Sequence, residues 1–87
     1  MNGIDNHMTE EQAREWASRR WGCVAETESH PHPTSFGDFV ATITVRVMGQ
    51  KIRGCGYSGL APWGVSMWAK AAHMLLMQEP SAIITLP

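Results

Sequence analysis

Four side chains with binding chemistry alternate along two neighbouring strand-like segments. Arg46 lies near the end of FVATITVRV, and Lys51, Arg53 and Tyr57 follow in QKIRGCGY. Because alternate residues of a strand share one face, we expect all four side chains on the outer face of a sheet. Three cations and an aromatic ring on such a face can contact phosphates and stack a base.

The alternative for this face is a solvated surface, because outward-facing polar residues are ordinary on a sheet with one face in water. Glu26 and Glu28 on a neighbouring strand would then offset the positive charge. The chain has 7 Lys and Arg against 8 Asp and Glu, a net charge of −1. A dedicated nucleic-acid binder usually has a basic excess, so the overall charge counts against that class without excluding a local patch.

A second candidate surface lies on WGVSMWAKAAHMLLM, whose apolar residues recur at helical spacing. Its predicted inner stripe comprises Val65, Trp68, Ala69, Ala72, Leu75 and Leu76. Its predicted outer strip comprises Met67, Lys70, Ala71, Met74 and Met77. Apolar strips left in water often mark partner or dimer contacts, and methionine suits them because its side chain is deformable. The alternative is that the first helix or the C-terminal tail covers part of this strip.

Catalytic and metal-binding patterns are weak in this chain. Cys23, Cys55 and His73 are scattered, while His30 and His32 are two residues apart in a proline-containing loop. Neither CxxC nor HExxH spacing occurs, and no nucleophile elbow or phosphate-binding glycine loop is present. We therefore expect no catalytic residues, metal or cofactor, with a small enzyme that uses Cys55 as a remaining alternative.

Length and composition predict one domain over residues 1–87. Two cysteines make no disulfide framework, and no apolar run approaches the ~18 residues of a membrane span. We expect a soluble, cytoplasmic protein without membrane contact. Met1–His7 is polar and without periodicity, so residues 1–8 are predicted to form a loose tail.

The first helix is predicted over residues 10–21. Thr9 and Gln12 have the spacing of a capping box, and Gly22 is a natural stop. Apolar residues recur at helical spacing, and two Glu–Arg pairs four residues apart would stabilise the outer side. They are Glu10 with Arg14 and Glu15 with Arg19.

Three strand-like segments follow. Cys23–Ser29 is a short candidate strand, and HPHP begins a loop that runs to about Gly37, since prolines cannot occupy a central strand. Phe39–Val47 alternates, and Gly49-Gln50 fits a two-residue hairpin turn that pairs Val47 with Ile52 and Val45 with Gly54. On the inner face, Gly54 and Gly56 would leave room for a helix to approach closely.

The second helix is predicted to have Pro62 in its first turn and to stop at Pro80. Residues 80–87, which include the β-prone AIITL, are predicted to be a C-terminal tail or a short edge strand. The fold class is therefore α+β: a three-stranded antiparallel sheet with two helices on one face, in the order α-β-β-β-α.

From about Thr9 to Met77 the chain resembles the double-stranded RNA-binding domain. AREWASRRWG is similar to that family's first helix, SFGDFVATITVRVMGQKIRGCGYS to its second and third strands, and MWAKAAHMLL to its second helix. The resemblance implies RNA contacts from the first helix, a loop containing histidine and a lysine cluster. Here His30 or His32 matches that loop loosely, and the cluster region LAPWGVSMWAK retains Lys70 alone, so the counterion-release term would be small.

About half of the chain, GQKIRGCGYSGLAPWGVSMWAKAAHMLLM, also resembles small phage-encoded anti-CRISPR proteins. This resemblance implies a non-enzymatic inhibitor, of phage or mobile-element origin, that occludes a surface of a CRISPR effector subunit in the host cytoplasm. The partner-binding residues would be Arg46, Lys51, Arg53, Tyr57, Met67, Lys70, Met74 and Met77. The alternative is a degenerate RNA-binding-like module that binds nucleic acid or forms a homodimer.

Overall fold

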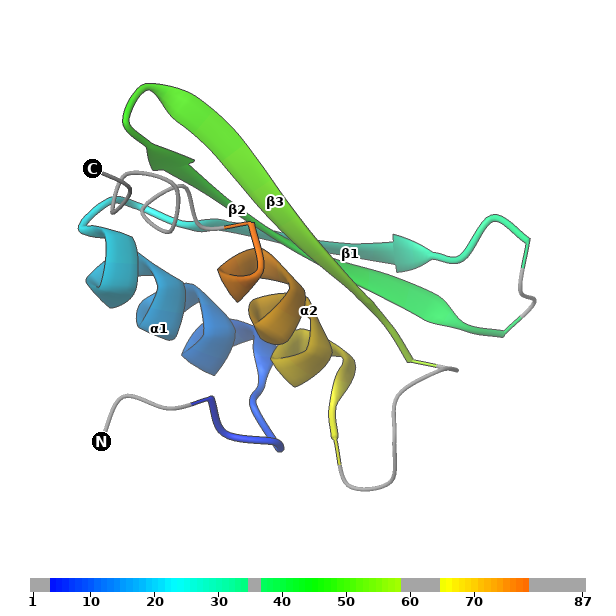
Figure 1. The fold of residues 1–87 in the computed structure, drawn as a ribbon. Coiled ribbons are helices and arrows are strands. Elements are labelled where there is room, and N and C mark those ends of the chain that lie inside the picture. The colour runs from blue at the N-terminus through cyan, green and yellow to red at the C-terminus, as the bar shows by residue number, and fades with distance from the viewer. Residues whose placement is uncertain (1–3, 35–36, 59–64, 79–87) are drawn as a thin grey trace.

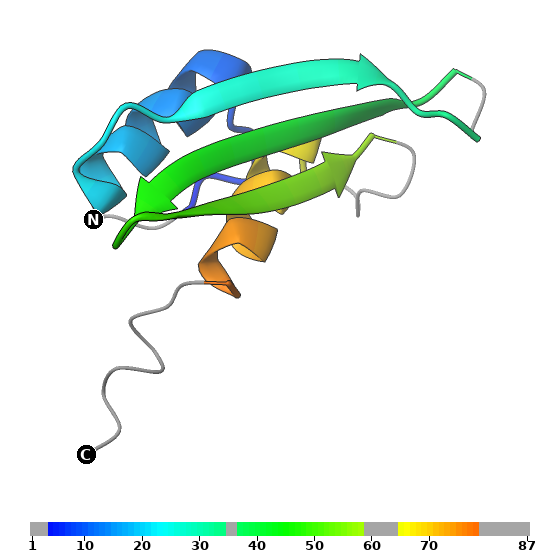
Figure 2. The ribbon, with the colours of Figure 1, turned by 90° about the horizontal axis from the view of Figure 1, so that it is seen from above.

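A three-stranded antiparallel sheet lies across two helices in the computed structural model, which describes residues 4–34, 37–58 and 65–78 (Figure 1). The elements are α1 (Glu10–Trp21), β1 (Glu26–Pro31), β2 (Phe39–Val47), β3 (Gln50–Tyr57) and α2 (Met67–Leu76). The strand order is β1-β2-β3, and Figure 2 shows both helices beneath the same face. The predicted fold class and the α-β-β-β-α layout are confirmed.

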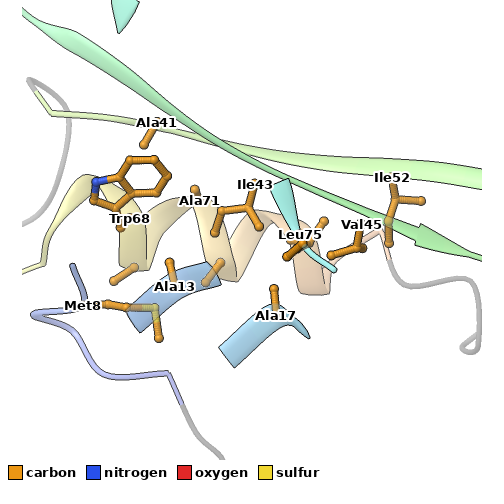
Figure 3. Close-up of a cluster of buried hydrophobic side chains, with 13 residues drawn as sticks. Met8, Ala13, Ala17, Ala41, Ile43, Val45, Ile52, Trp68, Ala71 and Leu75 are labelled. Carbon is orange, nitrogen blue, oxygen red and sulfur yellow. The ribbon is translucent and has the colours of Figure 1, made fainter. Parts of the chain in front are cut away.

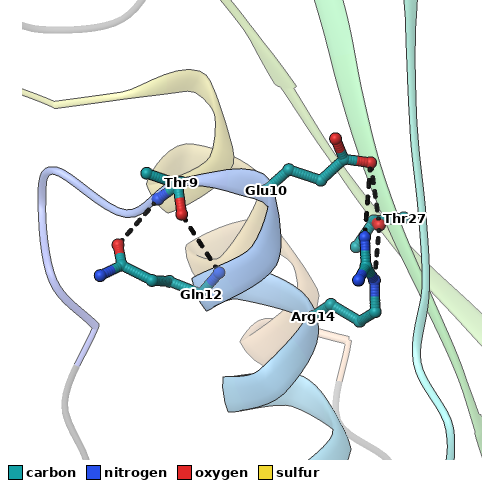
Figure 4. A network of polar contacts seen from close by, with 5 residues as sticks. All are labelled: Thr9, Glu10, Gln12, Arg14 and Thr27. Atoms are coloured by element: carbon teal, nitrogen blue, oxygen red, sulfur yellow. Dashed lines mark hydrogen bonds and ion pairs between the residues drawn. The ribbon is translucent and has the colours of Figure 1, made fainter.

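Helix α1 begins where its capping residues predict. The Thr9 hydroxyl accepts from the Gln12 backbone N–H at 3.2 Å, and the Gln12 side chain accepts from the Thr9 N–H at 3.0 Å (Figure 4). Gly22, with φ of 63°, ends the helix in the left-handed region. Both predicted Glu–Arg pairs form on its exposed side. The boundaries predicted from the sequence are therefore confirmed.

The segment before α1 is more closely packed than the predicted loose tail of residues 1–8. Met8 is only 4% exposed, and Ile4 packs against the core. The Met8 carbonyl also accepts from the Ser66 hydroxyl at 2.7 Å, and Ser66 is the N-cap of α2. For residues 4–8, the tail prediction therefore fails, because burial of Met8 and this hydrogen bond fix the segment to the start of α2.

Strand β1 begins three residues later and ends two residues later than the predicted Cys23–Ser29, so it includes His30 and Pro31. The loop predicted to begin at His30 therefore begins after Pro31. Proline is excluded from a central strand because it lacks an N–H, whereas β1 is an edge strand. At an edge, the missing N–H of proline removes no ladder hydrogen bond when it faces outward. The HPHP segment therefore contributes its first two residues to the sheet.

The β2–β3 hairpin turns one residue earlier than predicted, at Met48-Gly49. Val47 pairs with Gln50 and Val45 with Ile52, so the predicted pairing of Val47 with Ile52 is wrong. The φ angles of 53° at Met48 and 81° at Gly49 are those of a turn whose two central residues are left-handed. The partner of each β2 residue moves by two positions, which leaves every side chain on its predicted face.

The core lies between the sheet and the helices (Figure 3). Ile43, Val45 and Leu75 are its largest fully buried side chains. Gly54 and Gly56 let α2 approach β3: a Cβ on Gly54 would lie 2.3 Å from the Ala71 carbonyl oxygen, and one on Gly56 would lie 2.2 Å from the Met67 carbonyl oxygen. The predicted role of the two glycines is confirmed.

Helix α2 is shorter than predicted and is rotated slightly about its axis. Its N-cap is Ser66, whose hydroxyl accepts from the Ala69 N–H at 3.1 Å. Ala71, predicted in the outer strip, is fully buried against the β3 glycines. Pro62 and residues 80–87, with their predicted tail or edge strand, lie outside the described residues.

Candidate functional site

Arg46, Lys51 and Arg53 all project from the outer face of the β2–β3 hairpin, as predicted, and all are exposed. Arg46 lies directly opposite Lys51 in the ladder, and Arg53 is two residues further along β3. Like charges directly opposite one another destabilise a sheet pair. Within the described residues, no carboxylate lies at ion-pair distance from any of the three. The outer face of this hairpin is therefore a concentrated positive patch.

The acidic residues of the sheet lie on the opposite edge strand. Glu26 is opposite Thr44, and Glu28 is opposite Thr42. One edge strand, β1, therefore carries negative charge, and the other, β3, carries positive charge. Glu26, Arg46 and Lys51 share the lining of a hollow of about 60 Å³. Small-molecule sites occupy roughly 300–1,000 Å³, so this hollow is too small for a substrate. Because it lines this hollow, Glu26 lies near both Arg46 and Lys51, as the solvated-surface alternative expects, and offsets part of their charge.

Tyr57 is on the predicted face, at the far end of β3 from the cations. Its ring meets the His32 ring edge-on, with 4.9 Å between the centroids. The His32 Nδ1 accepts from the Thr34 backbone N–H at 3.1 Å. Sequence reasoning missed this ring contact. The register brings this end of β1 and of β3 to either side of Val40, since His30 and Tyr57 both pair with it, and His32 follows two residues after His30. Tyr57 therefore supports the loop after β1 and is only 36% exposed.

The side chains predicted on α2 lie along the free edge of β3. Ala71 faces the β3 glycines, and at about 100° per residue Met67 and Met74 lie on one side of Ala71. The buried Trp68, Ala72 and Leu75 lie on its other side, towards β2 and α1. Met74 is 40% and Met77 78% exposed. Met67 and Lys70 are half-buried, and Lys70 already makes a polar or electrostatic contact.

Gln78 links the predicted residues of the β2–β3 hairpin to those of α2, although sequence reasoning did not identify it. Its side-chain amide donates a hydrogen bond to the Arg53 carbonyl oxygen. That oxygen therefore points away from β2, towards the free edge of β3, and the end of α2 lies beside it. Gln78 is one helical turn after Met74, a spacing that could have indicated its position once α2 was placed under β3.

The structure thus brings together most of the predicted partner-binding residues around one strand edge. We call this the β3-edge surface, and it consists of Lys51, Arg53, the outward backbone of β3, Met67, Met74 and Met77. Arg46 adjoins it on the outer face, Lys70 lies in the same part of α2, and Tyr57 lies at its far end. The cations lie on the outer face of the sheet at this edge, and the methionines lie on α2, at the inner face.

Catalytic and metal chemistry has little support in the described part of the chain. The Cys55 thiol lies 3.9 Å from the Thr42 hydroxyl, and both cysteines are free. No group of three or more His, Cys, Asp or Glu residues that could hold a metal ion occurs among residues 4–34, 37–58 and 65–78. In the same residues, neither helix has the length and apolar character needed to cross a membrane.

Comparisons of the sequence and the structure with protein-family models, curated proteins and solved structures find no match. The functional interpretation therefore depends on the geometry of the β3-edge surface alone.

Proposed function

We propose that this chain is a non-enzymatic protein-binding inhibitor of phage or mobile-element origin, similar in action to anti-CRISPR proteins. It would act in the host cytoplasm by occluding a surface of a CRISPR effector subunit. The observation that supports this proposal is the β3-edge surface. Lys51 and Arg53 are exposed on β3, and Met74 and Met77 are exposed on the end of α2, which reaches the Arg53 carbonyl through Gln78. Adaptable apolar side chains near exposed cations suit a protein surface that presents both apolar and acidic groups.

Protein is favoured over nucleic acid as the partner because of what surrounds the cations. Phosphate-backbone binding needs several cations that release counterions, whereas this patch offers Arg46, Lys51 and Arg53 beside an apolar strip. Lys70, the one lysine that matches the RNA-binding family's cluster region, is half-buried and already engaged. Methionines 40% and 78% exposed add nothing to phosphate recognition but are useful at a protein interface.

Co-purification with CRISPR effector complexes tests the proposal. We expect the full chain to form a stable complex with one effector subunit, and the complex to be lost in Arg53→Glu and in Met74→Asp. The matched control is Arg19→Glu, whose side chain is 80% exposed and pairs with Glu15 on α1. An unchanged complex in both test variants would refute the surface assignment.

Duplex RNA provides the contrasting measurement. A nucleic-acid module should bind duplex RNA at low salt, with an affinity that falls steeply as salt increases. The inhibitor proposal predicts no such binding at low salt. If the chain forms no effector complex but binds RNA, and Arg53→Glu abolishes that binding, the inhibitor proposal is refuted and the chain is a nucleic-acid-binding protein.

A further inference from the structure

We propose that the β3-edge surface binds its partner by strand addition: an extended segment of another protein pairs antiparallel with β3 as a fourth strand. The segment would carry acidic side chains at alternate positions and apolar side chains between them. This inference depends on the proposed function and specifies how the partner is recognised. Peptides that add a strand to an exposed sheet edge gain affinity from main-chain hydrogen bonds and specificity from alternate side chains.

The register shows which backbone groups of β3 point away from β2. In an antiparallel pair, residues alternate between those that bond to the neighbouring strand and those that point away. Val47 and Gln50 flank the two-residue turn and face each other, so Gln50, Ile52, Gly54 and Gly56 bond to β2. The N–H and C=O groups of Lys51, Arg53, Cys55 and Tyr57 then point outward, and the bond from Gln78 to the Arg53 carbonyl agrees with this.

The two sides of the edge set the chemistry of the added strand. Its residues opposite Lys51 and Arg53 would share the outer face with those cations, where acidic side chains relieve the repulsion between Arg46 and Lys51. Its intervening residues would point towards α2, where Met67 and Met74 lie beside the edge. An alternating acidic and apolar segment therefore matches both sides.

A second copy of this chain fits the edge less well. Antiparallel pairing of β3 with β3 over most of its length would place Arg53 of one copy opposite or diagonally across from Arg53 of the other, which like-charge repulsion disfavours. Antiparallel pairing with β1 would set Thr27, Ser29 and Pro31 opposite the outward residues of β3, because Glu26 and Glu28 bond to β2. The cations would then face uncharged side chains. Thr27 in addition accepts from the Arg14 side chain at 3.2 Å and donates to Glu10 at 3.1 Å (Figure 4).

Gln78 partly covers the edge in the free chain. Unpaired sheet edges invite non-specific strand pairing, and native proteins protect them with side chains or covering elements. The amide of Gln78 occupies the Arg53 carbonyl, so an incoming strand must displace it. Gln78→Ala should therefore strengthen strand binding by about two- to tenfold, the equivalent of one solvent-exposed hydrogen bond.

Peptide binding by the full chain tests the inference without a known partner. The probe is a peptide, long enough to span β3, in which glutamate alternates with valine, and affinity is measured by calorimetry. We expect binding that Arg53→Glu weakens about tenfold and that Gln78→Ala strengthens. In the antiparallel register, the glutamates bond to β3, so N-methylation of the glutamates should abolish binding while N-methylation of the valines should preserve it.

Equal tolerance of both methylations would overturn strand addition, and the reverse pattern would overturn the antiparallel register. Amide hydrogen exchange of the free chain identifies other occupants. We expect fast exchange at Lys51, Arg53 and Cys55 that slows when the peptide is added. If these β3 amides are already protected without peptide, the inference is refuted. Protection that depends on protein concentration would mean that a second copy covers the edge, and protection independent of concentration would mean that the chain itself covers it.

Failure of this inference is distinguishable from failure of the proposed function. An effector complex that Arg53→Glu and Met74→Asp disrupt, combined with peptide binding insensitive to N-methylation, would retain the inhibitor and reject strand addition. Peptide binding with the expected methylation pattern, combined with no effector complex, would retain strand addition and reject the inhibitor.

Discussion

Gly54→Ala tests the close approach of α2 to β3 that places the methionines beside the strand edge. A Cβ at this position would lie 2.3 Å from the Ala71 carbonyl oxygen, 2.5 Å from the Leu75 nitrogen and 2.8 Å from the Leu75 Cα. All three atoms are main chain, so no rotamer change relieves the contact. The helix backbone would have to move by about 1 Å to restore ordinary van der Waals separation.

Two opposing terms decide the size of the effect. Alanine restricts the unfolded chain more than glycine, which would stabilise the fold by about 0.5–1 kcal/mol where the backbone is compatible. Overpacking a well-packed interior costs about 1–3 kcal/mol, and the upper part of that range applies because only backbone can move. We expect a net loss of about 2 kcal/mol in the free energy of unfolding, which corresponds to a midpoint lower by about 10 °C in a domain of this size.

Urea and thermal unfolding, followed by far-ultraviolet circular dichroism, measure this loss. Gly54→Val separates sterics from strand propensity, because propensity favours valine over alanine in a strand whereas the contact with α2 makes valine worse. The matched control is Gly22→Ala: this site has φ of +63° and open space around the Cβ position, so only the left-handed backbone, about 1 kcal/mol, opposes the change. Stability of Gly54→Val equal to or above that of Gly54→Ala would refute the packing account.

Three further changes have defined outcomes. Thr9→Ala removes the capping hydroxyl of α1 and should lower the free energy of unfolding in urea by about 1 kcal/mol; no change would mean that the capping box contributes nothing. Met48→Asn should raise it by about 0.5–1 kcal/mol, because asparagine tolerates the left-handed φ of 53° better than methionine; a loss of stability would contradict the turn assignment. Lys51→Glu should weaken binding of the alternating glutamate–valine peptide, whereas Arg19→Glu on α1 should leave its affinity in calorimetry unchanged; equal effects would mean that only net charge matters.

The elements that the sequence predicts well are those with local signals. The capping box at Thr9, the stop at Gly22 and the alternation of Phe39–Val47 each act within a few residues, and the structure has α1 and β2 at the predicted positions. The need for glycine at Gly54 and Gly56 was also readable, because two glycines on the inner side of a strand indicate close approach of another backbone.

The features that were missed depend on long-range contacts. The turn at Met48-Gly49 requires a non-glycine residue at positive φ, which local preference argues against and pairing of the whole hairpin overrides. Ala71 was placed outside because helical periodicity gives relative angles only, and the contact with β3 fixes the absolute rotation of α2. Pro31 is part of β1 because β1 is at the edge of the sheet, and local sequence does not predict strand order.

In the candidate site, too, local features were predictable and features that depend on long-range contacts were not. The faces of Arg46, Lys51 and Arg53 were predictable from alternation, since a shift of two residues in register preserves them. Their proximity to Met74 was not, because it arises from the direction in which α2 crosses beneath β3 (Figure 2). Gln78 and its bond to the Arg53 carbonyl depend on the same crossing.

The most direct measurement for the β3-edge surface is the affinity of one CRISPR effector subunit for three variants of the full chain. Arg53→Glu and Met74→Asp change this surface, while Arg19→Glu makes the same charge reversal on α1. We predict that the first two lose the complex and that Arg19→Glu binds like the unmodified chain, with all three equally stable in urea. Binding retained by both Arg53→Glu and Met74→Asp would contradict the assignment of the β3-edge surface as the site of protein recognition.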